Sequence, residues 1–187
     1  ISPNDNGCFD VIKQQFEGLD FSFEETNYKN ISNLVITNGN SKNKTFCFLG
    51  HTDVVPPGPE SEWTVPPFSG EIIDNKIYGR GAADMKGGVA CFISALKEFL
   101  SEYKDPSFNI MVLLNSNEEG KLENGKVDRV INEMIDKDKF IDFCLIGEPS
   151  SSKRVGDVIR IGRRGSLSGN LKVYGIQGHV AYPKQAL

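Results

Sequence analysis

Apolar residues recur along the chain with spacings that predict helices in some segments and strands in others. Apolar positions three or four residues apart predict helices at 9–19, 85–103 and 126–137. Runs that alternate or are continuously apolar predict strands at 21–28, 32–39, 44–50, 107–116 and 140–148. The Pro- and Gly-rich stretch 53–70 predicts a loop, followed by a small hairpin around Asp74 and Asn75.

The order of these elements predicts the fold class. Strands 44–50, 107–116 and 140–148 are continuously apolar, as strands covered on both faces of a parallel sheet are, and helices separate them. We therefore expect an α/β fold with a mostly parallel sheet flanked by helices. From Arg154 onward the chain alternates apolar and polar residues, which predicts antiparallel strands with one solvated face. We place a domain boundary near Gly165, between 1–164 and 165–187.

Composition and charge narrow the class of protein. The chain has 187 residues, and 21 Lys and Arg against 25 Asp and Glu give a net charge of −4, which excludes a polybasic nucleic-acid binder. No apolar run approaches the roughly 20 residues that a membrane span needs, so we expect a soluble protein with no membrane partner. Cys47, Cys91 and Cys144 lie in apolar runs and no CxxC pair is present. This pattern favours buried, reduced thiols in a cytoplasmic protein over a disulfide framework.

Groups that can bind metal or carry protons follow the carboxyl end of each predicted buried strand. His51 and Asp53 follow the first, Glu118 and Glu119 the second, and Glu148 the third. Asp84 stands at the start of the helix 85–103. Because open α/β sheets bind ligands at the carboxyl ends of their strands, these groups are expected to converge. A histidine with several carboxylates suits zinc or a similar divalent cation.

Taken singly, each of these residues has a structural explanation. His51 could cap backbone groups, Asp84 could be the N-cap of the following helix, and the acids at 118, 119 and 148 could be solvated loop residues. Together they favour a metal site, since carboxylates held close to one another repel without a cation.

A nucleotide site and covalent catalysis are both disfavoured. Gly79 and Gly81 begin a dinucleotide-type glycine pattern, but Asp84 takes the place of the third glycine, where a carboxylate would repel phosphate. The sequence also contains no GxSxG nucleophile motif.

Six strings in order, FLGHTDVVPPG, GRGAADMKGG, NSNEEG, IGEPSS, GRRGSL and IQGHVAYP, resemble the dinuclear-zinc aminoacylase and deacylase superfamily over the whole chain. GEPSS, GRRGS and GHVAYP resemble its desuccinylase branch. The resemblance implies a zinc exopeptidase-like catalytic domain followed by the first strands of a smaller α+β lid and dimerisation domain. It also implies hydrolysis of the amide of N-succinyl-LL-2,6-diaminopimelate, in lysine and diaminopimelate biosynthesis. The alternatives are another deacylase, of acetylornithine or of acylated amino acids, and a non-catalytic metal-binding protein.

The resemblance also implies a metal-site role for each matching residue. His51 and Glu148 would ligate the first of two zinc ions, Glu119 the second, and Asp84 would bridge them. Cobalt is a possible substitute for zinc. Asp53 would orient His51 through its other ring nitrogen, and Glu118 would be the general base. A cis peptide between Asp84 and Met85 is expected as well.

For the substrate, the resemblance implies that Arg163 and Ser166 bind a carboxylate and that His179 reaches the partner subunit's site in a homodimer. The chain departs from the family at Asn117, where the family has an aspartate. It also lacks the family's fifth ligand, a C-terminal histidine, since its only histidines are His51 and His179. The chain begins at Ile1 without a leader. We therefore expect a piece of a longer protein, impaired in activity by itself.

Overall fold

The computed structural model describes residues 1–39, 43–120, 127–162, 167, 169–172, 174–182 and 184. The chain divides into two units, Ile1–Pro149 and Ser150–Leu187. The candidate ligands of the sequence analysis all belong to the first unit. The arrangement below is therefore that of Ile1–Pro149.

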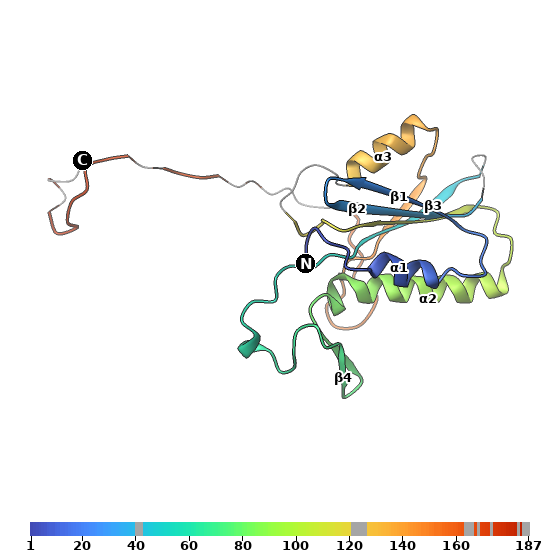
Figure 1. Cartoon of the computed structure of the whole chain (residues 1–187), viewed down its shortest axis with the longest axis horizontal. Helices are drawn as coiled ribbons and strands as arrows, with labels where there is room; N and C mark the ends of the chain where they lie inside the picture. The colour runs from blue at the N-terminus through green and yellow to red at the C-terminus, as the bar shows by residue number, and fades with distance from the viewer. Residues whose placement is uncertain are drawn as a thin grey trace. The chain divides into compact units, whose positions relative to one another are not determined.

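A five-stranded sheet forms the centre of this unit, in the order β1-β2-β6-β3-β7 (Figure 1). The strands are β1 Ser22–Tyr28, β2 Ile31–Thr37, β3 Thr45–His51, β6 Asn109–Asn115 and β7 Phe143–Ile146. β3 runs parallel to both β6 and β7, whereas β2 is antiparallel to β1 and β6. The α/β prediction is confirmed, and the sheet is mixed because a β1-β2 hairpin extends its parallel part.

Helices cover both faces of the sheet. On one face, α1 (Cys8–Gln14) and α2 (Gly87–Glu102) pack on alternate residues of β6, such as Ile110 and Val112. On the other face, α3 (Val127–Asp136) packs on the intervening residues, such as Met111. All seven residues of β6 are buried. The continuous apolar run that predicted this strand therefore has its physical cause in two covered faces.

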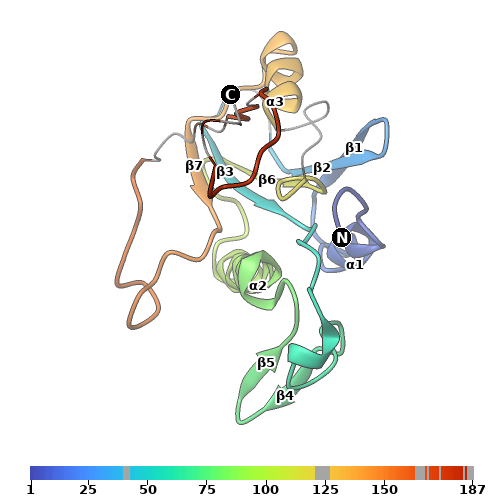
Figure 2. The same ribbon diagram turned by 90° about the vertical axis from the view of Figure 1, so that its left-hand side faces the viewer.

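The loop between β3 and α2 carries short elements that lead to the candidate ligand Asp84. They are a 3₁₀ turn at Glu60–Glu62, β4 (Glu71–Ile73), β5 (Lys76–Tyr78) and the irregular turn η2 (Ala82–Lys86). Asp74 and Asn75 both have positive φ, 48° and 60°, as a two-residue hairpin turn requires. The predicted hairpin is thus confirmed, and Figure 2 shows it on the far side of α2 from the sheet. None of the helices in the described ranges combines the length and apolar character needed to cross a bilayer.

Two local predictions were wrong. No described residue between 154 and 175 lies in a strand, because alternating segments form strands only against a pairing partner and the described residues of Ser150–Leu187 supply none. Cys47 is buried as expected, but Cys91 and Cys144 are exposed. Cys91 lies on the outer side of α2, and Cys144 lies on β7, which pairs only with β3 among the described strands. All four cysteines are free.

Candidate metal centre

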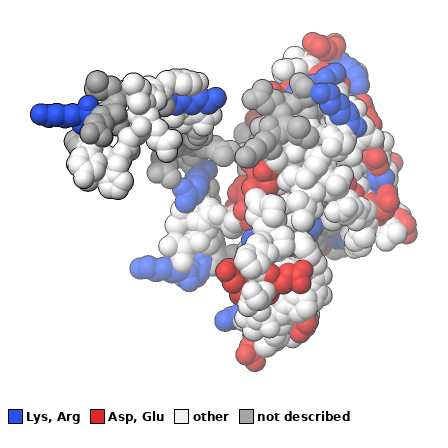
Figure 3. All heavy atoms as spheres, turned by 60° about the vertical axis from the view of Figure 1, so that its left-hand side comes forward, with Lys and Arg blue, Asp and Glu red and all other residues white. Residues whose placement is uncertain are grey.

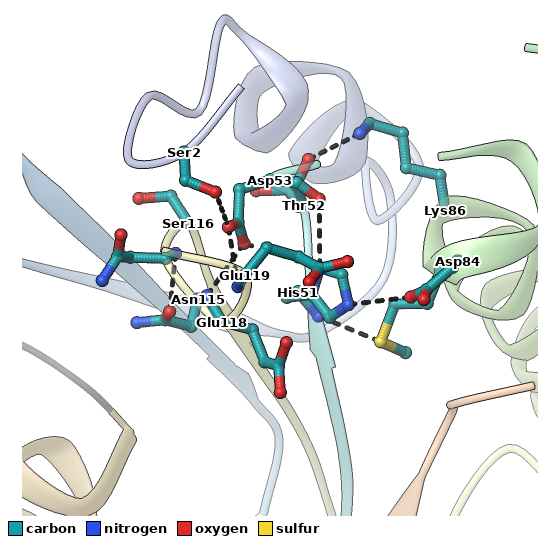
Figure 4. A network of polar contacts seen from close by, with 12 residues as sticks. Ser2, His51, Thr52, Asp53, Asp84, Lys86, Asn115, Ser116, Glu118 and Glu119 are labelled. Carbon is teal, nitrogen blue, oxygen red and sulfur yellow. Dashed lines mark hydrogen bonds and ion pairs between the residues drawn. The ribbon is translucent and has the colours of Figure 1, made fainter. Parts of the chain in front are cut away.

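The parallel strands bring their carboxyl ends to one edge of the sheet, as the sequence predicted. His51, the last residue of β3, stands opposite Asn115, the last residue of β6. Glu118 and Glu119 follow β6 directly, and Glu148 follows β7. The irregular turn η2, which directly precedes α2, passes the same edge and carries Asp84 (Figure 4). Residues far apart in the sequence therefore meet because β6, β3 and β7 are neighbours.

The distances define two overlapping clusters of potential ligand atoms. Nε2 of His51 lies 3.2 Å from Oδ1 of Asp84 and 3.3 Å from Oε1 of Glu148. His51, Glu118 and Glu148 each offer one atom, and these atoms lie within 4.8 Å of one another. The same holds for the set of His51, Asp84 and Glu119. Both clusters share the imidazole of His51.

His51 is fixed in the orientation that a ligand needs. Only 1% of the residue is exposed. Its Nδ1 lies 3.0 Å from the backbone oxygen of Asp53 and 3.5 Å from the carboxylate Oδ1 of the same residue. Both oxygens are acceptors, so Nδ1 carries the proton and Nε2 faces the carboxylates of Asp84 and Glu148. This is the arrangement in which a neighbouring acid sets the tautomer of a ligating histidine.

The electrostatics of the cluster fit a cation. Burial disfavours the imidazolium form of His51, but Asp53 and Glu148 favour it more strongly and raise the pKa of His51 to about 9. Burial also raises the pKa of Glu119, and the negative charges of Asp84 and Glu118 raise it further. The pKa of Glu148 is raised by its burial and, against the pull of His51, by the same two charges. A divalent cation among these groups would relieve their mutual repulsion, so the donor set suits a metal.

Close packing of α2 against β7 holds two of these ligands together. A Cβ atom added at Gly88 would lie 2.4 Å from the carbonyl oxygen of Gly147. Gly147 directly precedes Glu148, and Gly88 lies four residues after Asp84. The peptide between Asp84 and Met85 is cis, which confirms that prediction. The Met85 side chain is fully buried, and its sulfur accepts the N–H of His51 at 3.3 Å.

The predicted substrate-binding residues are not tested by this geometry. Arg163 and Ser166 lie outside the described residues. His179 is exposed in the Ser150–Leu187 unit, and its Nδ1 accepts the N–H of Ala181 at 3.1 Å. Their roles remain predictions.

Sequence reasoning missed several residues that hold the site together. Ser2 donates a hydrogen bond to the carboxylate of Asp53, and Lys86 donates from Nζ to the backbone oxygen of Thr52 at 2.6 Å. Contacts between segments so far apart leave no spacing signal in a single sequence, so nothing in the apolar pattern could have found Ser2 and Lys86.

On the face that Figure 3 shows, acidic and basic side chains are interspersed over the described atoms of Ile1–Pro149.

The fold and the ligand cluster together define a candidate metal centre on an α/β sheet. Residues 47–184 match the family model of Peptidase family M20/M25/M40, which is more than half of the chain. The chain therefore belongs to this metal-dependent family.

Particular relatives are more specific than the family. A protein from Psychromonas ingrahamii named succinyl-diaminopimelate desuccinylase is 48% identical over 183 residues, covering 98% of this chain and 48% of the relative. A protein of the same name from Methylococcus capsulatus is 47% identical over 186 residues, covering 100% of this chain and 49% of the relative. The chain thus spans about half the length of the curated relatives it matches.

Solved structures support the fold. An M20 family metallo-carboxypeptidase, Sso-CP2 from Sulfolobus solfataricus, has a TM-score of 0.64 at 25% identity and covers 76% of this chain and 32% of its own. Human carnosine dipeptidase 1 has a TM-score of 0.62 at 24% identity over 74% of this chain and 31% of its own. The second likeness shows the fold alone.

Proposed function

We propose that the protein hydrolyses the amide bond of N-succinyl-LL-2,6-diaminopimelate to succinate and LL-2,6-diaminopimelate, in lysine and diaminopimelate biosynthesis. The observation that carries the proposal is the convergence of His51 with four carboxylates at one sheet edge. The desuccinylase name of relatives at 47–48% identity supports the substrate. A reaction in amino-acid biosynthesis also favours a cytoplasmic location.

Two Zn²⁺ ions, with Co²⁺ as a possible substitute, are the proposed cofactors. His51 and Glu148 would hold one ion, Glu119 the other, and Asp84 both. The short distances from Nε2 of His51 to Asp84 and Glu148 support the first of these sets. When bound, such a cation polarises the amide carbonyl and lowers the pKa of the hydrolytic water.

In this proposal Glu118 is the general base. Its carboxylate lies within 4.8 Å of ligand atoms of His51 and Glu148, and its backbone N–H donates to Oδ1 of Asp53 at 3.0 Å. A carboxylate so close to the ligands, with no side-chain hydrogen bond to any other described residue, can take the proton from the attacking water oxygen. It then returns that proton to the leaving amine nitrogen. Asp53 keeps His51 in the tautomer that leaves Nε2 available.

Recognition of the substrate rests on residues of the second half of the chain. We propose that Arg163 and Ser166 bind a substrate carboxylate, since a guanidinium matches a carboxylate with two parallel hydrogen bonds. His179 would act in the partner subunit's site of a homodimer. This assignment divides the chain into a catalytic domain, 1–164, and the start of a lid and dimerisation domain, 165–187.

The test uses the full-length protein with added Zn²⁺, because this chain is expected to be impaired by itself, and measures loss of the succinyl amide. Glu118→Gln keeps the size of the side chain but removes its basicity, so we expect a fall in kcat of about 100-fold or more. Glu133→Gln on α3 is the control, because its charge lies on the exposed side of that helix. Cleavage of N-acetylornithine without cleavage of the succinyl substrate would favour the other deacylase. An unchanged rate in Glu118→Gln would favour a non-catalytic metal-binding protein.

A further inference from the structure

The carboxylate of Asp53 is a point at which three separate segments meet. It is 1% exposed, and its oxygens receive donors from both sides of the site. Oδ1 lies 3.5 Å from Nδ1 of His51 and accepts the N–H of Glu118 at 3.0 Å. Oδ2 accepts the N–H of Glu119 at 3.1 Å and the hydroxyl of Ser2. One buried side chain thus sets the imidazole and the backbone of the turn that carries both glutamates.

Ser2 differs from the other donors to Asp53 because it belongs to the N-terminal segment before α1. The others belong to β3 or to the turn after β6. Among the described residues, the other donor to Oδ2 is the backbone N–H of Glu119, so the Ser2 hydroxyl is the side-chain donor to this oxygen. An ionised carboxylate has about four lone-pair positions, and the four donors around Asp53 match that number. Loss of the hydroxyl would leave Oδ2 with one partner in a buried place, where an unsatisfied charged acceptor is costly.

The N-terminal segment that presents Ser2 is itself anchored on the ends of two strands. The Ser2 N–H donates to the backbone oxygen of Val54 at 3.3 Å, beyond β3. The hydroxyl of Ser116, beyond β6, donates to the backbone oxygen of Pro3 at 2.6 Å. A third bond is made by Asp5, three residues after Ser2.

Asp5 provides this third bond and also joins the segment to α1. Its Oδ1 accepts the hydroxyl of Thr52 at 3.1 Å. Its Oδ2 accepts the backbone N–H of Phe9, in the first turn of α1, at 3.0 Å. Since the segment is held at three points on the strand ends and by a helix, the position of the Ser2 hydroxyl over Asp53 is built into the fold.

From this geometry we propose that Ser2 is a positioning residue of the metal centre, acting through Asp53 on His51 and on the Glu118–Glu119 turn. Ser2 lies outside the family match, which begins at residue 47. The proposal rests on the proposed function only in taking these residues as metal ligands and base. Ser2 contacts no ligand atom directly. Its contribution is to stop the Asp53 carboxylate from turning away from the two backbone N–H groups.

The experiment compares three variants of the purified protein. Ser2→Ala removes the hydroxyl, Ser2→Thr retains it, and Ser22→Ala is the control, because the Ser22 hydroxyl donates to the backbone oxygen of Thr37 on the surface, at 3.1 Å. Zn²⁺ affinity is measured by competition with a chelating dye. The amide resonances of Glu118 and Glu119 are followed by ¹H–¹⁵N NMR in metal-free protein.

We expect Ser2→Ala to shift both amide resonances and to weaken Zn²⁺ binding about 10- to 100-fold, the usual effect of losing a partner behind a ligand. Ser2→Thr should restore both, and Ser22→Ala should change neither. If Ser2→Ala does not fold, Ser2→Cys is used. Its thiol donates weakly, so it should give a smaller loss of the same kind.

The proposal is overturned if Ser2→Ala, or Ser2→Cys in its place, binds Zn²⁺ within about twofold of the wild type with both amide resonances unmoved. Failure of Ser2→Thr to rescue would also overturn it, since a purely structural contact would then explain the loss. Both readouts are made without substrate. Absence of succinyl amide hydrolysis would therefore refute the proposed function while leaving the Ser2 result to stand or fall separately.

Discussion

A methyl group at Gly88 tests whether α2 must approach β7 closely for the ligands to meet. The added Cβ would lie 2.4 Å from the backbone oxygen of Gly147 and 3.4 Å from its carbonyl carbon. Unstrained contacts between heavy atoms need about 3.5 Å, so helix and strand would have to separate by about 1 Å. The oxygen belongs to backbone and cannot swing aside. The separation would draw Asp84 away from Glu148.

Two opposing effects set the magnitude, and their sum decides the sign. Alanine is a better helix former than glycine by at most about 1 kcal/mol. Overpacking a tight contact costs about 1–3 kcal/mol. We therefore expect Gly88→Ala to lose about 1–2 kcal/mol of unfolding free energy, since the clash is with immobile backbone. At about 2–4 °C per kcal/mol for a protein of this size, Tm should fall by about 2–8 °C.

Calorimetry and dye competition check this reasoning. Ser94→Ala, on the exposed side of the same helix, is the matched control and should leave Tm unchanged or slightly higher. Gly88→Ala should also bind Zn²⁺ more weakly than Ser94→Ala does. A Gly88→Ala protein with a raised Tm and unaltered Zn²⁺ affinity would show that the close approach is not needed, and the packing argument would be refuted.

Two further predictions concern residues away from the metal centre. Glu24 on β1 pairs with Lys137 at 2.9 Å and Lys139 at 3.3 Å, and these bonds lower the pKa of Glu24. Glu24→Gln should therefore cost less than about 1 kcal/mol at pH 7, because the pairs are half exposed. The wild-type advantage should vanish as pH falls through that lowered pKa, and urea melts showing a larger gap in acid would contradict this. A hydrogen bond from Cys47 lowers the pKa of the exposed Cys144 thiol to about 7, so iodoacetamide at pH 7 should label Cys144 before Cys47 and label it more slowly in Cys47→Ala. Peptide mapping that finds Cys47 labelled first would refute this order.

Much of the site could be predicted from sequence because its ligands follow strands with an unambiguous apolar signal. β3 and β6 are covered on both faces, so their sequences are continuously apolar. The ends of these two apolar runs indicate His51 and Glu119 as candidate ligands. Parallel strands share a carboxyl edge, so the edge at which the ligands gather could be predicted. The structure adds that the three ligand-bearing strands are neighbours. The placement of β2, antiparallel beside β6, could not be predicted, because side-chain alternation is the same for either direction.

The errors and omissions have a common physical origin in tertiary contacts. The segment 154–162 alternates as a strand does, but alternation describes only which face would be buried, and pairing decides whether a strand forms. Cys144 lies in an apolar run that predicted a strand covered on both faces, but all four residues of β7 are exposed. Ser2 reaches Asp53 across the fold through a hydrogen bond that no periodicity encodes.

The candidate ligands lie at or just after the ends of three different strands and in the turn η2 before α2. No single continuous segment of the chain carries all of them. A chain that has formed its helices but not its sheet would hold these groups far apart. Capture of the proposed cation would therefore require the assembled sheet, as is general for sites absent from the unfolded chain. The metal content per chain of a preparation would then serve as a direct measure of the fraction that has reached its native architecture.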